Sequence, residues 1–547
     1  MRRLAWFFLL LAGVQVASAQ DHHSQGAAKP AILLPGLGRH HHPISTYSPE
    51  AQRFFDQGLT LVFGFNHEEA VRSFERAAEL DPKSPMPWWG IALALGPNIN
   101  MPMDEAQHKR AYEALQKALT LATHAPENER AYVQALAGRY SSDPKADLMG
   151  LQVNYANNMF KLTIFLPDDL DAATLYAESL MDLNPWRLWT NDGKPAEGTE
   201  KIVAVLESVL KRDPNHIGAN HYYIHAVEAS PHPEKALASA KRLETLVPGA
   251  GHLVHMPGHT YMRTGDYGGV ITANERAAEA DRQYLRATGT EGGMYDLMYY
   301  SHNVHFLAHG YMAEGKFAEA LNAANELVAH VGPAVPQFAM AEFFLPTPYF
   351  VLLRFQRWDD VLKIPAPDAQ WTTTTGLWHF ARGVAHAAQG NVSAAQKERQ
   401  ELAVIESKTP PEAEFSAYFN KARTFLALAG ASLDARLAAA EGNRKLAIEH
   451  WKKAVEVQDS LNYGEPPEWY YPVRESLGGE LLRDGQFGQA ERVFREDLEK
   501  NPRNPRSLFG LMESLKAQKR NADAEWVRRQ FEAAWKDADV KLRVEDL

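Results

Sequence analysis

The sequence contains no cysteine among its 547 residues. Disulfides, thiolate metal sites and iron–sulfur clusters are therefore excluded, and any metal ion must be held by His, Asp, Glu or Met. The chain also lacks an excess of positive charge, because 57 basic residues stand against 68 acidic ones and the net charge is −11. Such a chain has no general attraction to a phosphate backbone, so we expect no nucleic-acid partner.

Long hydrophobic runs are also scarce, and the one near the start has the features of a secretory signal peptide over residues 1–19. Arg2 and Arg3 form a basic start, a short apolar run extends from Leu4 to Val14, and Ala17–Ala19 offers a small-residue cleavage site. The run is too short to span a bilayer. We therefore expect a periplasmic or secreted protein with no membrane span after signal removal.

Past the signal, residues 20–48 are rich in Pro, Gly and His, and we expect a flexible lead-in there. From residue 49 onward a pattern of small and aromatic residues recurs with a period of about 34 residues. In the unit that starts at Ala51, the pattern consists of Phe54, Gly58, Ala70, Phe74, Ala77 and Pro82. Further units start near Ile217, Gly251, Ser301, Glu342, Gly376, Leu428, Tyr471 and Pro505.

This pattern resembles the tetratricopeptide repeat (TPR), a helix–turn–helix unit. The resemblance implies an all-α, right-handed TPR-type helical solenoid with a concave groove lined by the first helix of each repeat. We expect N-terminal repeats with inserts over 49–213, histidine-bearing repeats over 214–341 and C-terminal repeats over 342–547. A glycine is expected to turn the chain after the first helix of five repeats, at Gly265, Gly315, Gly390, Gly442 and Gly485.

Three inserts interrupt the period, at residues 96–103, 184–199 and 285–300. The third precedes a histidine-bearing helix and contains several glycines and tyrosines. It is therefore a candidate lid over the groove, the alternative being an ordinary long connection.

Histidine occupies matching positions in three neighbouring first helices. The second, fifth and ninth positions of these repeats give nine places, and a composition of 22 histidines in 547 residues would fill fewer than one of them by chance. Eight are filled, by His221, His225, His252, His255, His259, His302, His305 and His309. Residues four apart share a helix face, so two imidazoles can converge on one ion at ~2.0–2.1 Å. The pattern predicts one or two transition-metal ions in the groove.

Copper or zinc is the expected metal, with iron as an alternative, because all-nitrogen sites suit these ions. Paired helical His-x-x-x-His motifs are similar to coupled dicopper oxygenase sites, by ligand type only. Met262 and Met312 lie on the same stripe and favour copper. Glu178 and Glu228 are candidate carboxylate ligands or general bases, for an oxidoreductase or a hydrolase.

The same groove has a second interpretation that needs no metal. Most proteins of this repeat superfamily bind a peptide or protein in the groove, and the resemblance implies a peptide, protein or small-molecule ligand here. The histidines would then contact that ligand or act as a pH switch. Whether the protein is an enzyme stays open at this point.

Overall fold

The computed structural model describes residues 30–416 and 420–547, so the predicted signal peptide lies outside the described residues. Within those ranges the chain is helical, and β-pairing is limited to isolated bridges such as Asn98 with Met101. Consecutive helices pack against each other as hairpins. The pairs are α1 (Pro49–Phe63) with α2 (His67–Leu80), α3 (Met86–Ala94) with α4 (Glu105–Ala122), α5 (Glu127–Leu136) with α6 (Leu148–Phe165), α7 (Leu170–Met181) with α8 (Thr199–Arg212), α9 (Ile217–Glu228) with α10 (Leu237–Leu246), α11 (Gly251–His255) and α12 (Pro257–Thr264) with α13 (Tyr267–Thr288), α14 (Ser301–Glu314) with α15 (Phe317–Val331), α16 (Thr347–Arg354) with α17 (Trp358–Lys363), α18 (Thr372–Ala388) with α19 (Val392–Lys408), α20 (Ala422–Ala440) with α21 (Arg444–Asp459), α22 (Arg474–Arg483) with α23 (Phe487–Lys500), and α24 (Pro505–Ala517) with α25 (Asn521–Ala534).

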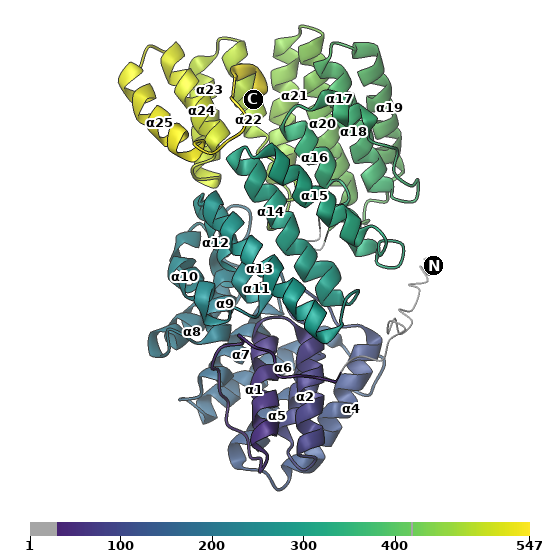
Figure 1. Ribbon diagram of the computed structural model, residues 1–547, viewed down its shortest axis with the longest axis vertical. Coiled ribbons are helices and arrows are strands. Elements are labelled where there is room, and N and C mark those ends of the chain that lie inside the picture. The colour runs from purple at the N-terminus through teal and green to yellow at the C-terminus, as the bar shows by residue number, and fades with distance from the viewer. Residues whose placement is uncertain (1–29, 417–419) are drawn as a thin grey trace, which may run out of the picture.

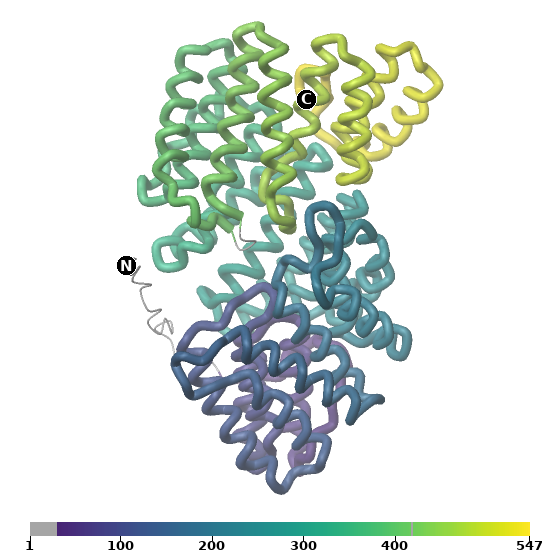
Figure 2. Tube along the Cα trace, turned by 180° about the vertical axis from the view of Figure 1, so that it is seen from behind, coloured from purple at the N-terminus to yellow at the C-terminus, as the bar shows by residue number. Residues whose placement is uncertain are grey.

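The hairpins stack in chain order into an elongated solenoid, with the N-terminal hairpins at the bottom of Figure 1 and the C-terminal ones at the top. Figure 2 shows the same order from behind. The predicted all-α, TPR-type solenoid is therefore confirmed. Two hydrophobic cores fill it, and their residues interleave along α13 and α14. The histidine-bearing helix α14 thus lies where the two cores meet, near the middle of the molecule in Figure 1.

The small residues of the repeat do what the pattern requires of them. A Cβ on Gly58 would lie 2.5 Å from the Phe74 ring, so glycine lets α1 approach α2 closely. The five predicted turning glycines all adopt a left-handed φ between 75° and 80°. Gly265 and Gly315 end α12 and α14 in this way, and an L side chain there would be strained.

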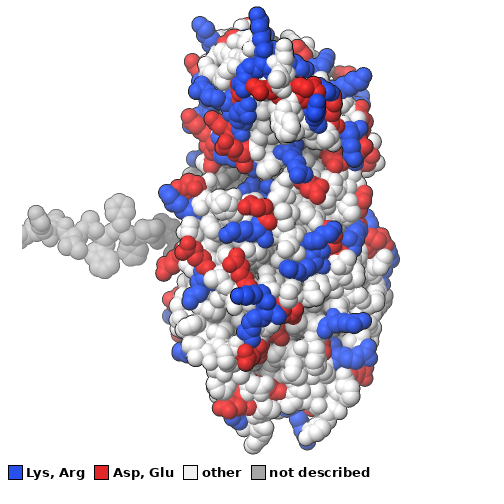
Figure 3. All heavy atoms as spheres, turned by 90° about the vertical axis from the view of Figure 1, so that its left-hand side faces the viewer, with Lys and Arg blue, Asp and Glu red and all other residues white. Residues whose placement is uncertain are grey.

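The surface and helix lengths also bear on partners. No helix of the described chain is both long and apolar enough to span a membrane. On the face shown in Figure 3, basic and acidic side chains are interspersed without a broad patch of one sign.

Residues 30–48, expected to be part of a flexible lead-in, instead pack on the N-terminal hairpins. The reason is a buried carboxylate at the start of α7. His42 Nδ1 lies 2.7 Å from Asp171 Oδ2, and His216 Nε2 and His40 Nε2 each lie 3.1 Å from Asp171 Oδ1. Burial would raise the pKa of Asp171, but the three imidazoles hold it well below its usual range. Burial alone would lower the pKa of His40 and His42, but Asp171 raises both.

This cluster predicts that the packing of residues 30–48 depends on pH. The pKa values of His40 and His42 are raised in the folded state. The stability that these two imidazoles give to the packed segment is therefore complete below about pH 6.5 and is lost as pH rises through the raised values. We expect amide exchange over residues 30–48, corrected for its intrinsic rate, to quicken from about pH 6 to about pH 9. In Asp171→Asn, amide exchange over residues 30–48 should be fast at both pH values, because the segment loses about 1–3 kcal/mol of local stability.

Asp168→Asn is the matched control for this experiment, because the Asp168 side chain is exposed and pairs with the exposed Arg212. If exchange over residues 30–48 is slow at both pH values and stays slow in Asp171→Asn, the Asp171 carboxylate does not hold this segment in place.

Candidate metal centre

Six of the eight predicted histidines form two groups of three. The first triad is His221 and His225 of α9 with His252 of α11, and the second triad is His255 of α11, His259 of α12 and His302 of α14. Within each triad, one nitrogen from every ring lies within 4.8 Å of the others. α11 contributes one ring to each triad, and α12 begins directly after it at Pro257.

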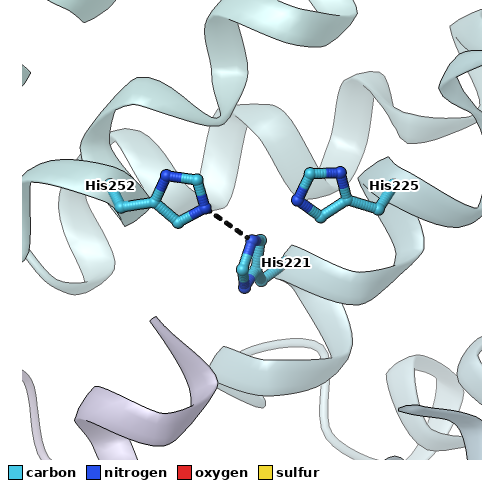
Figure 4. Close-up of side chains that lie close together, drawn as sticks. All are labelled: His221, His225 and His252. Carbon is cyan, nitrogen blue, oxygen red and sulfur yellow. Dashed lines mark hydrogen bonds between the residues drawn. The ribbon is translucent and has the colours of Figure 1, made fainter. Parts of the chain in front are cut away.

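The rings of the first triad face one another between two neighbouring helices, α9 and α11, as Figure 4 shows. The ring centroid of His221 lies 4.9 Å from that of His225 and 5.0 Å from that of His252. The Nε2 atoms of His221 and His252 are 3.2 Å apart. Two ligands of a tetrahedral ion bound at ~2.0–2.1 Å have a similar separation, about 3.3 Å.

The second triad repeats this arrangement one hairpin further on. The His255 centroid lies 4.7 Å from that of His259 and 4.8 Å from that of His302. The Nε2 atoms of His255 and His259 are only 2.7 Å apart.

The two triads adjoin each other and share one carboxylate, Glu228, at the end of α9. Its Oε1 accepts a hydrogen bond from His225 Nδ1 at 2.9 Å, and its Oε2 accepts one from His259 Nδ1 at 2.5 Å. Burial would raise the pKa of Glu228, but His259 and His225 lower it to about 2. Glu228 is therefore an ionised acceptor that fixes one ring of each triad. Ring centroids across the boundary, 5.4 Å apart for His225 with His259 and 5.6 Å for His252 with His255, fall within the range of 4.7–6.2 Å found inside the triads.

Hydrogen bonds at Nδ1 decide where the ring lone pairs point. The Asn274 amide donates to the Val270 carbonyl, so its Oδ1 is the acceptor for His255 Nδ1 at 2.6 Å. Since Glu228 fixes His259 in the same tautomer, both Nε2 atoms carry lone pairs directed at each other. In the first triad, His221 Nδ1 donates to the Phe63 carbonyl at 2.5 Å, which again leaves Nε2 as the ligand atom. This is the outer shell that histidine ligands of metal ions use.

The triads also contain ring nitrogens with no partner in the described chain. His225 Nε2 and His252 Nδ1 are buried and make no hydrogen bond. An unpaired buried polar atom costs about 1–3 kcal/mol, so the arrangement is expensive unless something binds to it.

Five of the six triad imidazoles have a lowered pKa, which favours their neutral form. Burial and then the neighbouring rings hold the pKa well below the usual value for His221, His252, His255 and His302. Burial likewise lowers the pKa of His259, although Glu228 opposes the shift. Neutral imidazole is the form that binds metal ions.

Each triad is backed by one phenylalanine ring. Phe65 lies 4.6, 5.8 and 5.7 Å from the rings of His221, His225 and His252, and Phe306 lies 4.7, 5.1 and 4.9 Å from those of His255, His259 and His302. Both phenylalanines are buried and exclude water from one side of their triad. The sequence does not single them out, because a phenylalanine in a repeat is expected to pack in the hydrophobic core.

The three inserts build the far side of the site. A cavity of about 50 Å³ touches two rings of each triad. Its lining is His225, His252, His259 and His302 with Asn100, Met101, Trp186, Met298, Tyr299, Phe343 and Phe344. Five of these residues come from the inserts at 96–103, 184–199 and 285–300, and the two phenylalanines from the short helix η3 (Ala339–Phe344).

Backbone irregularity marks the same walls. The third insert, the candidate lid, ends in a π-helix, η2 (Tyr295–Tyr300), which places the Tyr299 ring 4.8 Å from that of His252. Phe65 and Trp186 both have a left-handed φ, of 55° and 58°. Such backbone costs about 1–3 kcal/mol per residue and gathers at functional sites.

The other predicted site residues lie elsewhere. His305 and His309 form a separate buried pair, 4.8 Å between centroids, in which His305 packs on Phe343 and Phe344. They lie one and two turns along α14 from His302, and within the described chain they join neither triad.

The two carboxylate candidates also differ from each other. Glu178 lies buried beside Asp182, whose carboxylate pairs with Arg139 at 2.6 Å, and burial raises the pKa of Glu178. Glu228 is at the site, but both of its oxygens are engaged by imidazoles. This geometry fits an orienting carboxylate better than a general base.

Comparison with known proteins bears on the fold alone. No family model matches the chain, and no curated protein matches it in sequence. Matching solved structures include a monomeric IFIT1 mutant with Gppp-AAAA (14% identity, 86% of this chain and 95% of that one, TM-score 0.37), the Cut9–Hcn1 assembly of the APC/C (13%, 91% and 96%, 0.29) and yeast Tom70 (10%, 88% and 96%, 0.31). These TM-scores lie below 0.5, so the assignment of the fold rests on the stacked helical hairpins of this chain itself. The ligands of these proteins carry no argument about the two triads.

Removing the charge of Glu228 tests its role. In Glu228→Gln the amide oxygen can accept from only one of the two Nδ1–H groups, while the amide nitrogen faces the other. We expect affinity for copper or zinc to fall about 10–100-fold, as for other outer-shell substitutions, measured by competition with a chelator.

Glu234→Gln is the matched control, since Glu234 pairs with His232 at 3.2 Å on the exposed surface. Equal metal affinity in the two variants would show that Glu228 does not orient the ligands.

Proposed function

We propose that the protein is an exported TPR-solenoid metalloprotein that holds two transition-metal ions, one in each triad. One observation carries the proposal: the Nε2 lone pairs of His255 and His259 face each other at 2.7 Å while both Nδ1 atoms are committed as donors. Neutral rings in this arrangement repel, and a cation between them removes the repulsion. In the first triad, His221 Nδ1 is likewise a donor and His225 Nε2 has no partner in the described chain.

Copper is the metal that this ligand set favours, with zinc as the second choice. All six ligands are neutral nitrogens, and the nearest carboxylate binds the rings at Nδ1 rather than facing the cavity. Iron sites of this kind more often include a carboxylate ligand. The thioethers of Met101 and Met298 line the cavity, whereas Met262 and Met312 line a different pocket with His309. Soft sulfur beside the site supports copper.

A single ion between His225, Glu228 and His259 is the competing arrangement, because these three groups also lie within 4.8 Å of one another. It would use the two Nδ1 atoms and leave the converging Nε2 atoms unbound. The metal-free scaffold is the other alternative. Five of the six rings are at most 4% exposed, so they offer little surface to a peptide. Of the three arrangements, two ions, one in each triad, engage the largest number of ring nitrogens.

Metal content tests the proposal. The protein purified with copper and passed over a desalting column should hold two ions per chain by elemental analysis. His221→Ala with His225→Ala should remove one ion, and His255→Ala with His259→Ala should remove the other, because each pair supplies two of the three ligands of its triad.

His305→Ala with His309→Ala is the matched control and should keep both ions, with circular dichroism confirming the fold of every variant. A wild-type protein that retains no metal, or a control pair that loses as much as the triad pairs, would overturn the proposal.

A further inference from the structure

The cavity between the triads limits what can reach the two ions. Its volume of about 50 Å³ exceeds the ~10–15 Å³ that one water needs, yet lies far below the ~300–1,000 Å³ of pockets for organic ligands. It is reached by both triads at once, through His225 and His252 on one side and His259 and His302 on the other. A molecule of two or three heavy atoms fits, and it would lie beside two rings of each triad.

We propose that this cavity binds a neutral diatomic gas, dioxygen above all, between two Cu(I) ions. The inference rests on the proposed function and adds the class of ligand to it. No lining side chain is charged, so the protein itself supplies no partner for an anionic substrate. The walls are thioether and aromatic groups apart from the ring nitrogens, the Asn100 amide and the Tyr299 hydroxyl.

Hydrolysis fits the cavity less well than redox chemistry. A hydrolytic site needs a base near the attacking water and room for the substrate. Glu228 is the carboxylate nearest the rings, and both of its oxygens accept Nδ1–H bonds away from the Nε2 atoms. Dioxygen needs neither a base nor a proton to bind. Each Cu(I) gives one electron, so the two ions become Cu(II), dioxygen becomes peroxide, and its O–O bond stays intact.

The inserts set the size limit. Trp186 packs edge-on to His225 at 5.7 Å, and Tyr299 packs edge-on to His252 at 4.8 Å, so each insert covers one ring of the first triad. Phe343 and Phe344 form the remaining aromatic wall. Larger neutral ligands of Cu(I) should therefore be excluded by shape rather than by chemistry.

Two neutral Cu(I) ligands of different size test this directly. Protein loaded without oxygen with two Cu(I) per chain should bind carbon monoxide, seen as a metal-carbonyl band in the infrared, and should not bind tert-butyl isocyanide. Air should then produce the optical absorption of Cu(II) with bound peroxide. The zinc-loaded protein, with the same fold and no electrons to give, should show neither the carbonyl band nor the oxygen response.

Variants of the wall separate size from metal binding. Met298→Phe should keep both copper ions and weaken carbon monoxide binding by roughly tenfold or more, because the larger side chain takes the ligand's space. Met340→Phe, at a partly exposed methionine outside the cavity, should bind like the wild type. Phe343→Ala should admit tert-butyl isocyanide.

Failure of gas binding and failure of metal binding can be told apart. Two bound copper ions without carbon monoxide binding, or tert-butyl isocyanide binding as tightly as carbon monoxide in the wild type, would overturn the gas-binding inference and leave the metal site standing. A protein that holds no copper would overturn the proposed function and this inference with it.

Discussion

The carboxylate of Glu228, hydrogen-bonded to His225 and His259, is the interaction on which the rest of the site depends. It fixes one ring of each triad in the Nδ1–H tautomer and brings one negative charge into a buried cluster of imidazoles. Two cations placed close together would repel, and a buried carboxylate between their ligands offsets part of that repulsion. The triads are therefore joined electrostatically as well as by position.

The solenoid supplies the regular part of this arrangement, and its interruptions supply the specific part. Stacked first helices bring rows of histidine into register, but a uniform repeat would leave those rows facing an open groove. The inserts at 96–103, 184–199 and 285–300 instead close over the rings and, with η3, leave a cavity of about 50 Å³. The strained backbone of Phe65 and Trp186 lies in the same region. The inserts thus narrow the groove beside the rings to a small cavity.

Helical periodicity made part of the site predictable from the sequence. The spacing of His221 with His225 and of His255 with His259 required that each pair share a face, and the repeat register brought them together. Less could be predicted where a loop or the rotation of a helix about its axis decides the position of a side chain. His305 and His309 obey the same spacing as the ligand pairs, yet α14 carries them past the junction of the triads and onto Phe343 and Phe344. The lead-in over residues 30–48 has no periodic pattern, so the sequence does not predict the contact between His42 and Asp171, which are 129 residues apart.

Anomalous X-ray diffraction from copper-loaded crystals, measured on both sides of the copper absorption edge, tests the two-ion site most directly. We predict two peaks per chain, one among the Nε2 atoms of each triad, with Glu228 between the two and bound to neither. One peak on the Glu228 carboxylate between His225 and His259, or no peak within reach of these rings, would contradict the two-ion site.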